Sequence, residues 1–208
     1  MSSNMNGAQN IENQPKKHHV GATIVVTIIV IAVLGLISAF IWPGWAVKSN
    51  TASQATSQQA ANQTPKIAAI ALPANSTNLL KAMPADVGAY ARQQITNTSV
   101  WSQTLPLEEH KIVYSTGDSS QNITLLVGQW ALANNAQSVY SSLAAKLTGN
   151  KIASGDVKVN GQKTGTYQVN EAADNANQAV AIWQNSTCIF EISGPTSAVK
   201  SFYQEFPL

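Results

Sequence analysis

The chain has 208 residues, a formal net charge of +2, three histidines and one cysteine. Residues 1–76 carry four lysines against one glutamate, whereas residues 77–208 carry eight basic side chains against nine acidic ones, so the basic balance belongs to the N-terminal part. A near-neutral domain without a clustered basic face argues against a nucleic-acid partner, and a single cysteine excludes an intrachain disulfide and a multi-cysteine metal site.

An uncharged apolar run extends from Val20 to Trp42. As a helix, these 23 residues would be roughly 35 Å long, which is enough to cross a bilayer. Lys16 and Lys17 precede the run and only Lys48 closely follows it, so the positive-inside rule places residues 1–19 in the cytoplasm. The sequence therefore predicts one transmembrane helix over 20–42, with the remaining residues outside the cell membrane.

A cleaved signal peptide, which would leave a secreted domain, is the alternative for this segment. A secretory apolar core is about 7–15 residues long and precedes a small-residue cleavage site. Here the run is longer, and the nearest match to such a site is Gly44-Trp45-Ala46, so length and flanks favour a retained anchor. Gly35 and Ala39 form a small-xxx-small pair that would let two such helices approach closely, which predicts weak self-association.

A linker is expected over residues 43–75. Residues 48–66 are almost entirely Ser, Thr, Gln, Asn and Ala, without an aromatic side chain or an apolar period, a composition typical of a disordered tether. Residues 67–75, IAAIALPAN, are more apolar. Two alternatives stay open for them: they dock onto the following domain, or they pass loosely into it.

The domain is expected over residues 76–208, and its first half alternates short segments with turn signals. STNLLKAMP predicts a brief helix that Pro84 ends, and AYARQQITN and HKIVYST predict strands. ITLLVGQW is apolar on both faces, which predicts a central strand covered on both sides. Apolar residues at helical spacing then predict a helix over 133–147.

The second half is expected to contain two hairpins and a final helix. Asn160-Gly161 is typical of a tight type I′ turn, and QAVAIWQN and TCIFEIS predict a second strand pair. Apolar residues at helical spacing predict a closing helix that Pro207 ends: Val199, Phe202, Tyr203 and Phe206. The pattern predicts an α+β fold, with a mostly antiparallel sheet of about seven strands and helices packed on one face.

Two residues are candidates for ligand binding. Trp101 lies in the polar stretch TNTSVWSQT and is expected to be an exposed aromatic side chain. His110 is the domain's sole histidine, beside Glu108 and Glu109; a solvated position at the start of an edge strand is favoured over a catalytic pairing with a carboxylate.

Recognisable catalytic or cofactor motifs are missing from the sequence. There is no nucleophile elbow, zinc-protease helix, phosphate-binding loop or dinucleotide-binding loop, so no cofactor, metal or catalytic residue is predicted. Cys188 alternates with Phe190 and Ile192 and is expected to be a small buried side chain. An envelope enzyme with an unrecognised site remains the alternative.

The stretches AVAIWQNSTCIFEISGP and AVKSFYQEFPL resemble the C-terminal part of uncharacterised single-pass membrane proteins of actinobacteria. That resemblance implies an N-terminal anchor, a low-complexity spacer and a small extracytoplasmic α+β domain, and it carries no activity and no site residues. The sequence thus favours a membrane-anchored domain that binds a protein, a peptide or another component of the cell envelope.

Overall fold

The computed structural model describes residues 64–207. The predicted transmembrane helix, its cytoplasmic flank and most of the predicted linker lie outside the described residues. Within residues 64–207, no helix is long and apolar enough to cross a membrane.

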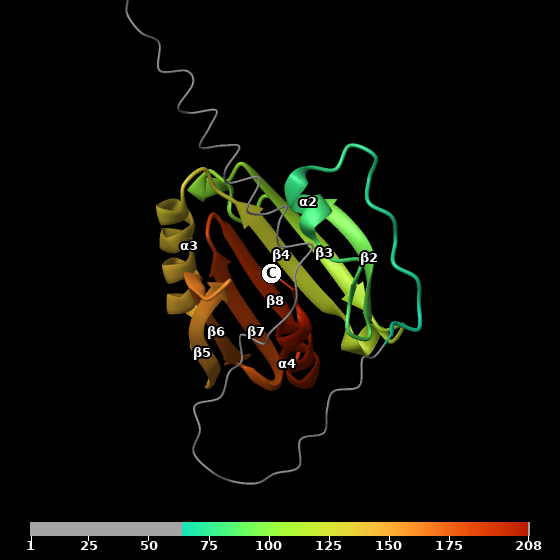
Figure 1. Cartoon of the computed structure of the whole chain (residues 1–208). Helices are drawn as coiled ribbons and strands as arrows, with labels where there is room; N and C mark the ends of the chain where they lie inside the picture. The colour runs from blue at the N-terminus through green and yellow to red at the C-terminus, as the bar shows by residue number, and fades with distance from the viewer. Residues whose placement is uncertain (1–63, 208) are drawn as a thin grey trace, which may run out of the picture. The chain divides into compact units, whose positions relative to one another are not determined.

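An antiparallel sheet of eight strands forms the centre of the domain, in the order β1-β2-β3-β4-β8-β7-β6-β5 (Figure 1). The strands are β1 (Asp86–Val87), β2 (Tyr90–Asn97), β3 (Glu108–Ser115), β4 (Ile123–Gln129), β5 (Lys151–Val159), β6 (Gln162–Ala172), β7 (Asn175–Asn185) and β8 (Cys188–Pro195). The α+β class and the antiparallel sheet are as predicted. The strand beyond the expected seven is β1, whose two residues are too few to leave an alternating pattern in the sequence.

Helices cover both faces of the sheet, so the prediction of helices on one face is wrong. α2 (Asn78–Ala82) and α4 (Thr196–Glu205) pack into the larger core, and α3 (Ala133–Lys146) packs into a smaller core on the other side. The physical reason lies in β7 and β8. Consecutive residues there are buried, Ile182 with Trp183 and Ile189 with Phe190, and consecutive side chains of a strand point to opposite faces.

The local signals of the second half are confirmed. Asn160 and Gly161 have φ angles of 51° and 79°, as a type I′ turn requires, and they join β5 to β6. The closing helix α4 places Phe206 against Trp183 and Phe190, with ring centroids 5.3 and 5.8 Å apart. An aromatic cluster therefore fixes α4 on the sheet.

Residues 67–75 dock onto the domain, one of the two alternatives that the sequence left open. The amide of Ile70 donates to the carbonyl oxygen of Arg92 at 2.8 Å, and the side chain of Gln93 donates to Ala68 at 2.8 Å. Ile67 lies beside Gly117, in the turn between β3 and β4. From there the chain follows the β2 edge to α2 at the opposite end of the sheet (Figure 1).

Candidate functional site

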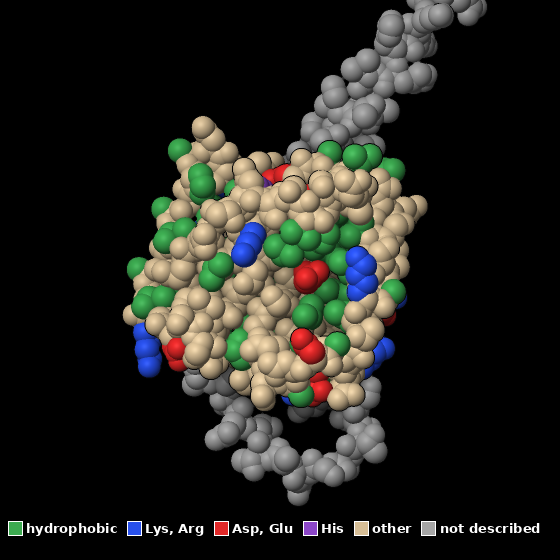
Figure 2. Space-filling view, turned by 180° about the vertical axis from the view of Figure 1, so that it is seen from behind, with side chains coloured by type: hydrophobic (Ala, Val, Ile, Leu, Met, Phe, Trp, Pro, Cys, Tyr) green, Lys and Arg blue, Asp and Glu red, His purple; other side chains and the backbone are tan. Residues whose placement is uncertain are grey.

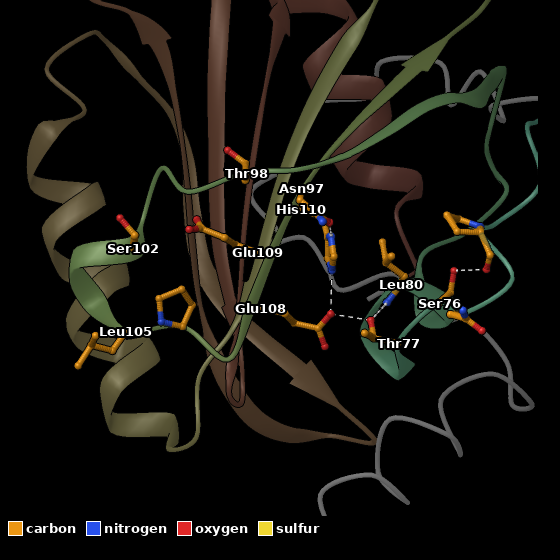
Figure 3. A pocket seen from close by; sticks show the side chains of 13 residues that line it. Ser76, Thr77, Leu80, Asn97, Thr98, Ser102, Leu105, Glu108, Glu109 and His110 are labelled. Atoms are coloured by element: carbon orange, nitrogen blue, oxygen red, sulfur yellow. Dashed lines mark hydrogen bonds and ion pairs between the residues drawn. The ribbon is translucent and has the colours of Figure 1, made fainter.

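A hollow of about 710 Å³ lies where β2 ends, β3 begins and α2 starts (Figure 3). Nine of its thirteen lining residues are polar or charged, and two leucines and two prolines supply apolar surface. The lining residues are Pro73, Asn75, Ser76, Thr77, Leu80, Asn97, Thr98, Ser102, Leu105, Pro106, Glu108, Glu109 and His110.

Hydrogen bonds join four of these side chains, from three elements, into one network. Glu108 and His110 are two residues apart on β3 and share a face, and His110 lies opposite Asn97 in the register of β2 with β3. His110 Nε2 lies 2.7 Å from Glu108 Oε2, and His110 Nδ1 lies 3.1 Å from Asn97 Oδ1. Both nitrogens of the imidazole are therefore engaged.

The fourth member of the network is Thr77, the residue that caps the N-terminus of α2. Its Oγ1 accepts a hydrogen bond from the amide of Leu80 at 3.3 Å and donates to Glu108 Oε2 at 2.5 Å. The cap of a short helix thus fixes the carboxylate of β3 (Figure 3). We call Thr77, Asn97, Glu108 and His110 the polar network.

His110 is not the solvated residue of an edge strand that the sequence favoured. Its side chain is buried, with 6% of the residue exposed, and β3 is paired with β2 on one side and β4 on the other. The sequence around His110 could not show its burial, because its hydrogen-bond partner Asn97 comes from a different strand.

Trp101 is buried as well, so the expectation of an exposed aromatic side chain is wrong. It is 6% exposed and packs against Trp130, with ring centroids 5.8 Å apart. Its amide donates to Glu109 Oε2 at 2.8 Å. Glu109 adjoins His110 in sequence and, as the next residue of a strand, points to the other face, so the two predicted residues lie at one end of the sheet on opposite faces.

The loop between β2 and β3, residues 98–107, is built around Trp101. Thr104 donates to the Trp101 carbonyl oxygen from its amide at 2.8 Å and from its hydroxyl at 2.7 Å. Trp130 Nε1 donates to the Thr104 carbonyl oxygen at 3.0 Å, and the amide of Leu107 donates to Gln129 at 2.7 Å. The loop is therefore held in one conformation by hydrogen bonds within itself and to the end of β4.

This end of the sheet also carries exposed apolar side chains that sequence reasoning missed. Three belong to the 98–107 loop and the fourth precedes α3, and they are between 62% and 83% exposed. We call them the apolar rim: Val100, Leu105, Leu107 and Leu132. Three of them lie in a stretch with no charged residue, but an apolar residue in a loop does not by itself indicate exposure.

The hydrogen bonds of His110 differ from those of a nucleophile–histidine–carboxylate triad. In a Ser-His-Asp arrangement the hydroxyl faces the imidazole, whereas Thr77 bonds the carboxylate and the second nitrogen of His110 faces an amide. Burial raises the pKa of Cys188 to about 11, so its thiol is not a nucleophile near neutral pH. Among residues 64–207, no three His, Cys, Asp or Glu side chains gather as a metal site.

Neither the protein-family models nor the curated proteins contain a match to this chain. A structural match is the crystal structure of a GTP binding regulator from Thermotoga maritima. It shares 8% sequence identity with this chain over 56% of this chain and 75% of the other, and the TM-score is 0.38.

Proposed function

We propose that this protein is a single-pass membrane protein that presents a small extracytoplasmic binding module in the cell envelope. The anchor is the predicted helix over residues 20–42, whose length and flanking lysines support a cytoplasmic N-terminus. The module is the described domain, and its binding site is the hollow that contains the polar network.

The observation that carries this proposal is an accessible hollow whose polar floor is already ordered. Glu108 Oε2 receives hydrogen bonds from two partners, and His110 is bonded at both nitrogens. Ordered side chains lose little further entropy when a ligand binds, so such a floor favours recognition. The short distance between Glu108 and His110 supports the alternative of an envelope enzyme, but the two imidazole nitrogens are bonded to Glu108 and Asn97 and not to a hydroxyl or a thiol.

The location is tested by labelling single cysteines with a membrane-impermeant maleimide. On a Cys188→Ala background, Ser119→Cys in the exposed turn before β4 should react in intact cells, and Ser3→Cys should react only after lysis. Reaction of Ser3→Cys in intact cells would contradict the topology. A mature N-terminus near Val47, measured by mass spectrometry, would instead show a secreted domain released by cleavage.

The binding role is tested by photo-crosslinking in intact cells. A photoreactive residue at Ser102, which lines the hollow and is exposed, should give a discrete adduct. The control at Ser119, in the turn at the far end of β3 and β4, should not give that adduct. No adduct from Ser102, or the same adduct from both positions, would count against a binding site in the hollow.

A further inference from the structure

Exposed apolar side chains are concentrated at the end of the sheet that carries the hollow. The described residues contain five exposed large hydrophobic side chains: Ile70 and the four residues of the apolar rim. Isolated exposed apolar side chains are normal on a soluble surface, whereas a group of them marks an interaction site. In the view from behind, hydrophobic side chains are visible along the upper end of the domain and also in the middle of that face (Figure 2).

Leu105 is the rim residue whose conformation is most unusual. Its φ and ψ are 54° and 55°, a left-handed conformation that is unfavourable for a leucine. Its side chain is 83% exposed, so the strain is not compensated by burial. The hydrogen bonds of the 98–107 loop hold this conformation, and Leu105 and Leu80 border the hollow on different sides (Figure 3). An exposed apolar side chain on a strained backbone that hydrogen bonds hold in place indicates a contact made with another molecule.

The charge of the hollow limits which chemical groups a binding partner can place in it. The lining contains two glutamates and a histidine but no lysine or arginine. Glu108 Oε2 accepts two hydrogen bonds, and Oε1 has no hydrogen-bond partner among the described residues. A cation or another hydrogen-bond donor complements this oxygen, whereas a phosphate or carboxylate group would meet two glutamates and no lysine or arginine.

The point where the chain enters the domain favours a protein over a bilayer as the occupant. Ile67, close to the start of the described residues, lies at the turn between β3 and β4. The apolar rim is at the opposite end of these strands. Attachment through the N-terminal segment therefore joins the domain at the end of the sheet that does not carry the rim, which favours a protein partner over the membrane that holds the anchor.

We infer that the apolar rim and the hollow together dock a segment of another envelope protein that carries an apolar side chain directly beside a lysine or arginine. The apolar side chain packs on Leu105 and its neighbours, and the cation lies on Glu108. This inference rests on the proposed function, because it identifies the class of partner for the same site.

The test uses the full-length protein in nanodiscs and a displayed library of random dodecapeptides. Enriched peptides should carry an apolar residue next to lysine or arginine. For a synthetic peptide of that sequence, Leu105→Ser should weaken binding at least tenfold, and Glu108→Gln should weaken it several-fold and reduce its dependence on salt. Matched controls are Ile70→Ser, an exposed apolar residue outside the rim, and Asp174→Asn, an exposed acid far from the hollow; both should bind like the wild type.

A change in the peptide keeps the test informative if Glu108→Gln disturbs the polar network. Replacing the peptide's lysine by glutamate should abolish binding to the wild-type protein. Enrichment of acidic peptides, or wild-type affinity of Leu105→Ser, would overturn the inference. If a Ser102 adduct forms and is unaffected by Leu105→Ser and Glu108→Gln, the inference fails and the proposed function stands.

A bilayer as the occupant is examined with Leu105→Cys carrying a polarity-sensitive dye. The protein is reconstituted in vesicles of phosphatidylethanolamine and phosphatidylglycerol without peptide. The dye should report an aqueous environment; a blue shift like that of a dye placed within the acyl chains would show that the rim enters the membrane and would refute a protein partner.

Discussion

Arg92 shows how a single buried cation organises the start of the domain. The residue is 4% exposed, and its guanidinium donates to the carbonyl oxygens of Met83 and Pro84, each at 3.0 Å, and of Ile70 at 3.1 Å. No carboxylate forms an ion pair with it among residues 64–207. Backbone carbonyl groups therefore take the place of a counter-ion, and they join residues 67–75 to the segment after α2.

Replacing Arg92 by leucine should destabilise the domain by about 3 kcal/mol, because one buried and two partly buried carbonyl oxygens lose a charged donor. Urea unfolding followed by tryptophan fluorescence measures the change. Arg92→Lys keeps the charge but has a shorter side chain, so it should lose less unfolding free energy than Arg92→Leu. A loss below about 0.5 kcal/mol for Arg92→Leu, the size typical of surface changes, would show that the three contacts are not important for stability.

Glu191 provides a pH dependence at the residue scale. It is partly buried on β8, and burial raises the pKa of its carboxyl group, an effect that Lys146 at the end of α3 opposes. A raised folded-state pKa means that the folded protein binds this proton more tightly than the unfolded chain. The stabilisation of the folded state by this proton is thus fully present below the pKa of the unfolded chain, near 4.5. It is lost as the pH rises through the pKa of the folded state.

Glu191→Gln should therefore melt at a higher temperature than the wild type at pH 7, and the difference should shrink as the pH falls through the raised folded-state pKa and vanish below about 4.5. Thermal unfolding by circular dichroism between pH 3 and pH 8 tests this. A variant less stable than the wild type at pH 7 would show that the pairing with Lys146 outweighs burial.

At the scale of elements, the 98–107 loop is stabilised by its hydrogen bonds, whereas the exposed apolar side chain of Leu105 adds no stability to it. Leu105 buries little surface and occupies a left-handed conformation. A loop of this kind is expected at a binding site, where a conformation that lowers the stability of the domain is kept because it binds a partner.

Leu105→Asn should increase the free energy of unfolding by roughly 0.5–1 kcal/mol, because asparagine tolerates the left-handed region better than leucine. The same variant should weaken the binding of the apolar–basic peptide. Equilibrium unfolding and peptide titration on the same preparation test both changes. Lower stability in Leu105→Asn would mean that the leucine side chain packs on the domain.

At the scale of the whole molecule, the two faces of the sheet make two cores of different size. Cys188 lies in the larger core, is 1% exposed and has a pKa raised by burial to about 11. Its position on β8, between β4 and β7 in the sheet, means that local opening at the edges does not expose it.

A thiol reagent should consequently react with Cys188 only through unfolding of the whole domain. At pH 8 without denaturant, modification should be orders of magnitude slower than that of free cysteine, and its rate should rise with urea in parallel with the unfolded population. Fast reaction of the native protein would show that the centre of the sheet opens separately.

Much of the fold could be predicted from local signals. The two-faced apolar pattern of β4, the Asn160-Gly161 turn and the helical spacing around Phe202 each reflect a few neighbouring residues, and all three are confirmed. β1 was missed because two residues carry no periodicity, and the side taken by α3 was missed because it depends on which face of β7 and β8 is left uncovered.

Of the two residues selected from the sequence, only His110 lines the hollow. His110 and Trp101 were selected for their residue types, but both were given the wrong environment, because contacts between strands and loops decide burial. Asn97 and Thr77 were not selected, since an amide in β2 and a helix cap acquire their role from the register and from where α2 docks.

The sequence by itself determined the apolar run at 20–42, the near-neutral charge of the domain, the antiparallel α+β class and the single thiol, because each depends on composition or on short-range pattern. Only the tertiary structure decided that Glu108 and His110 meet Asn97 and Thr77, and that Val100, Leu105, Leu107 and Leu132 share one end of the sheet. These are contacts between residues far apart in the chain, and the pairing of strands and the packing of helices bring them together.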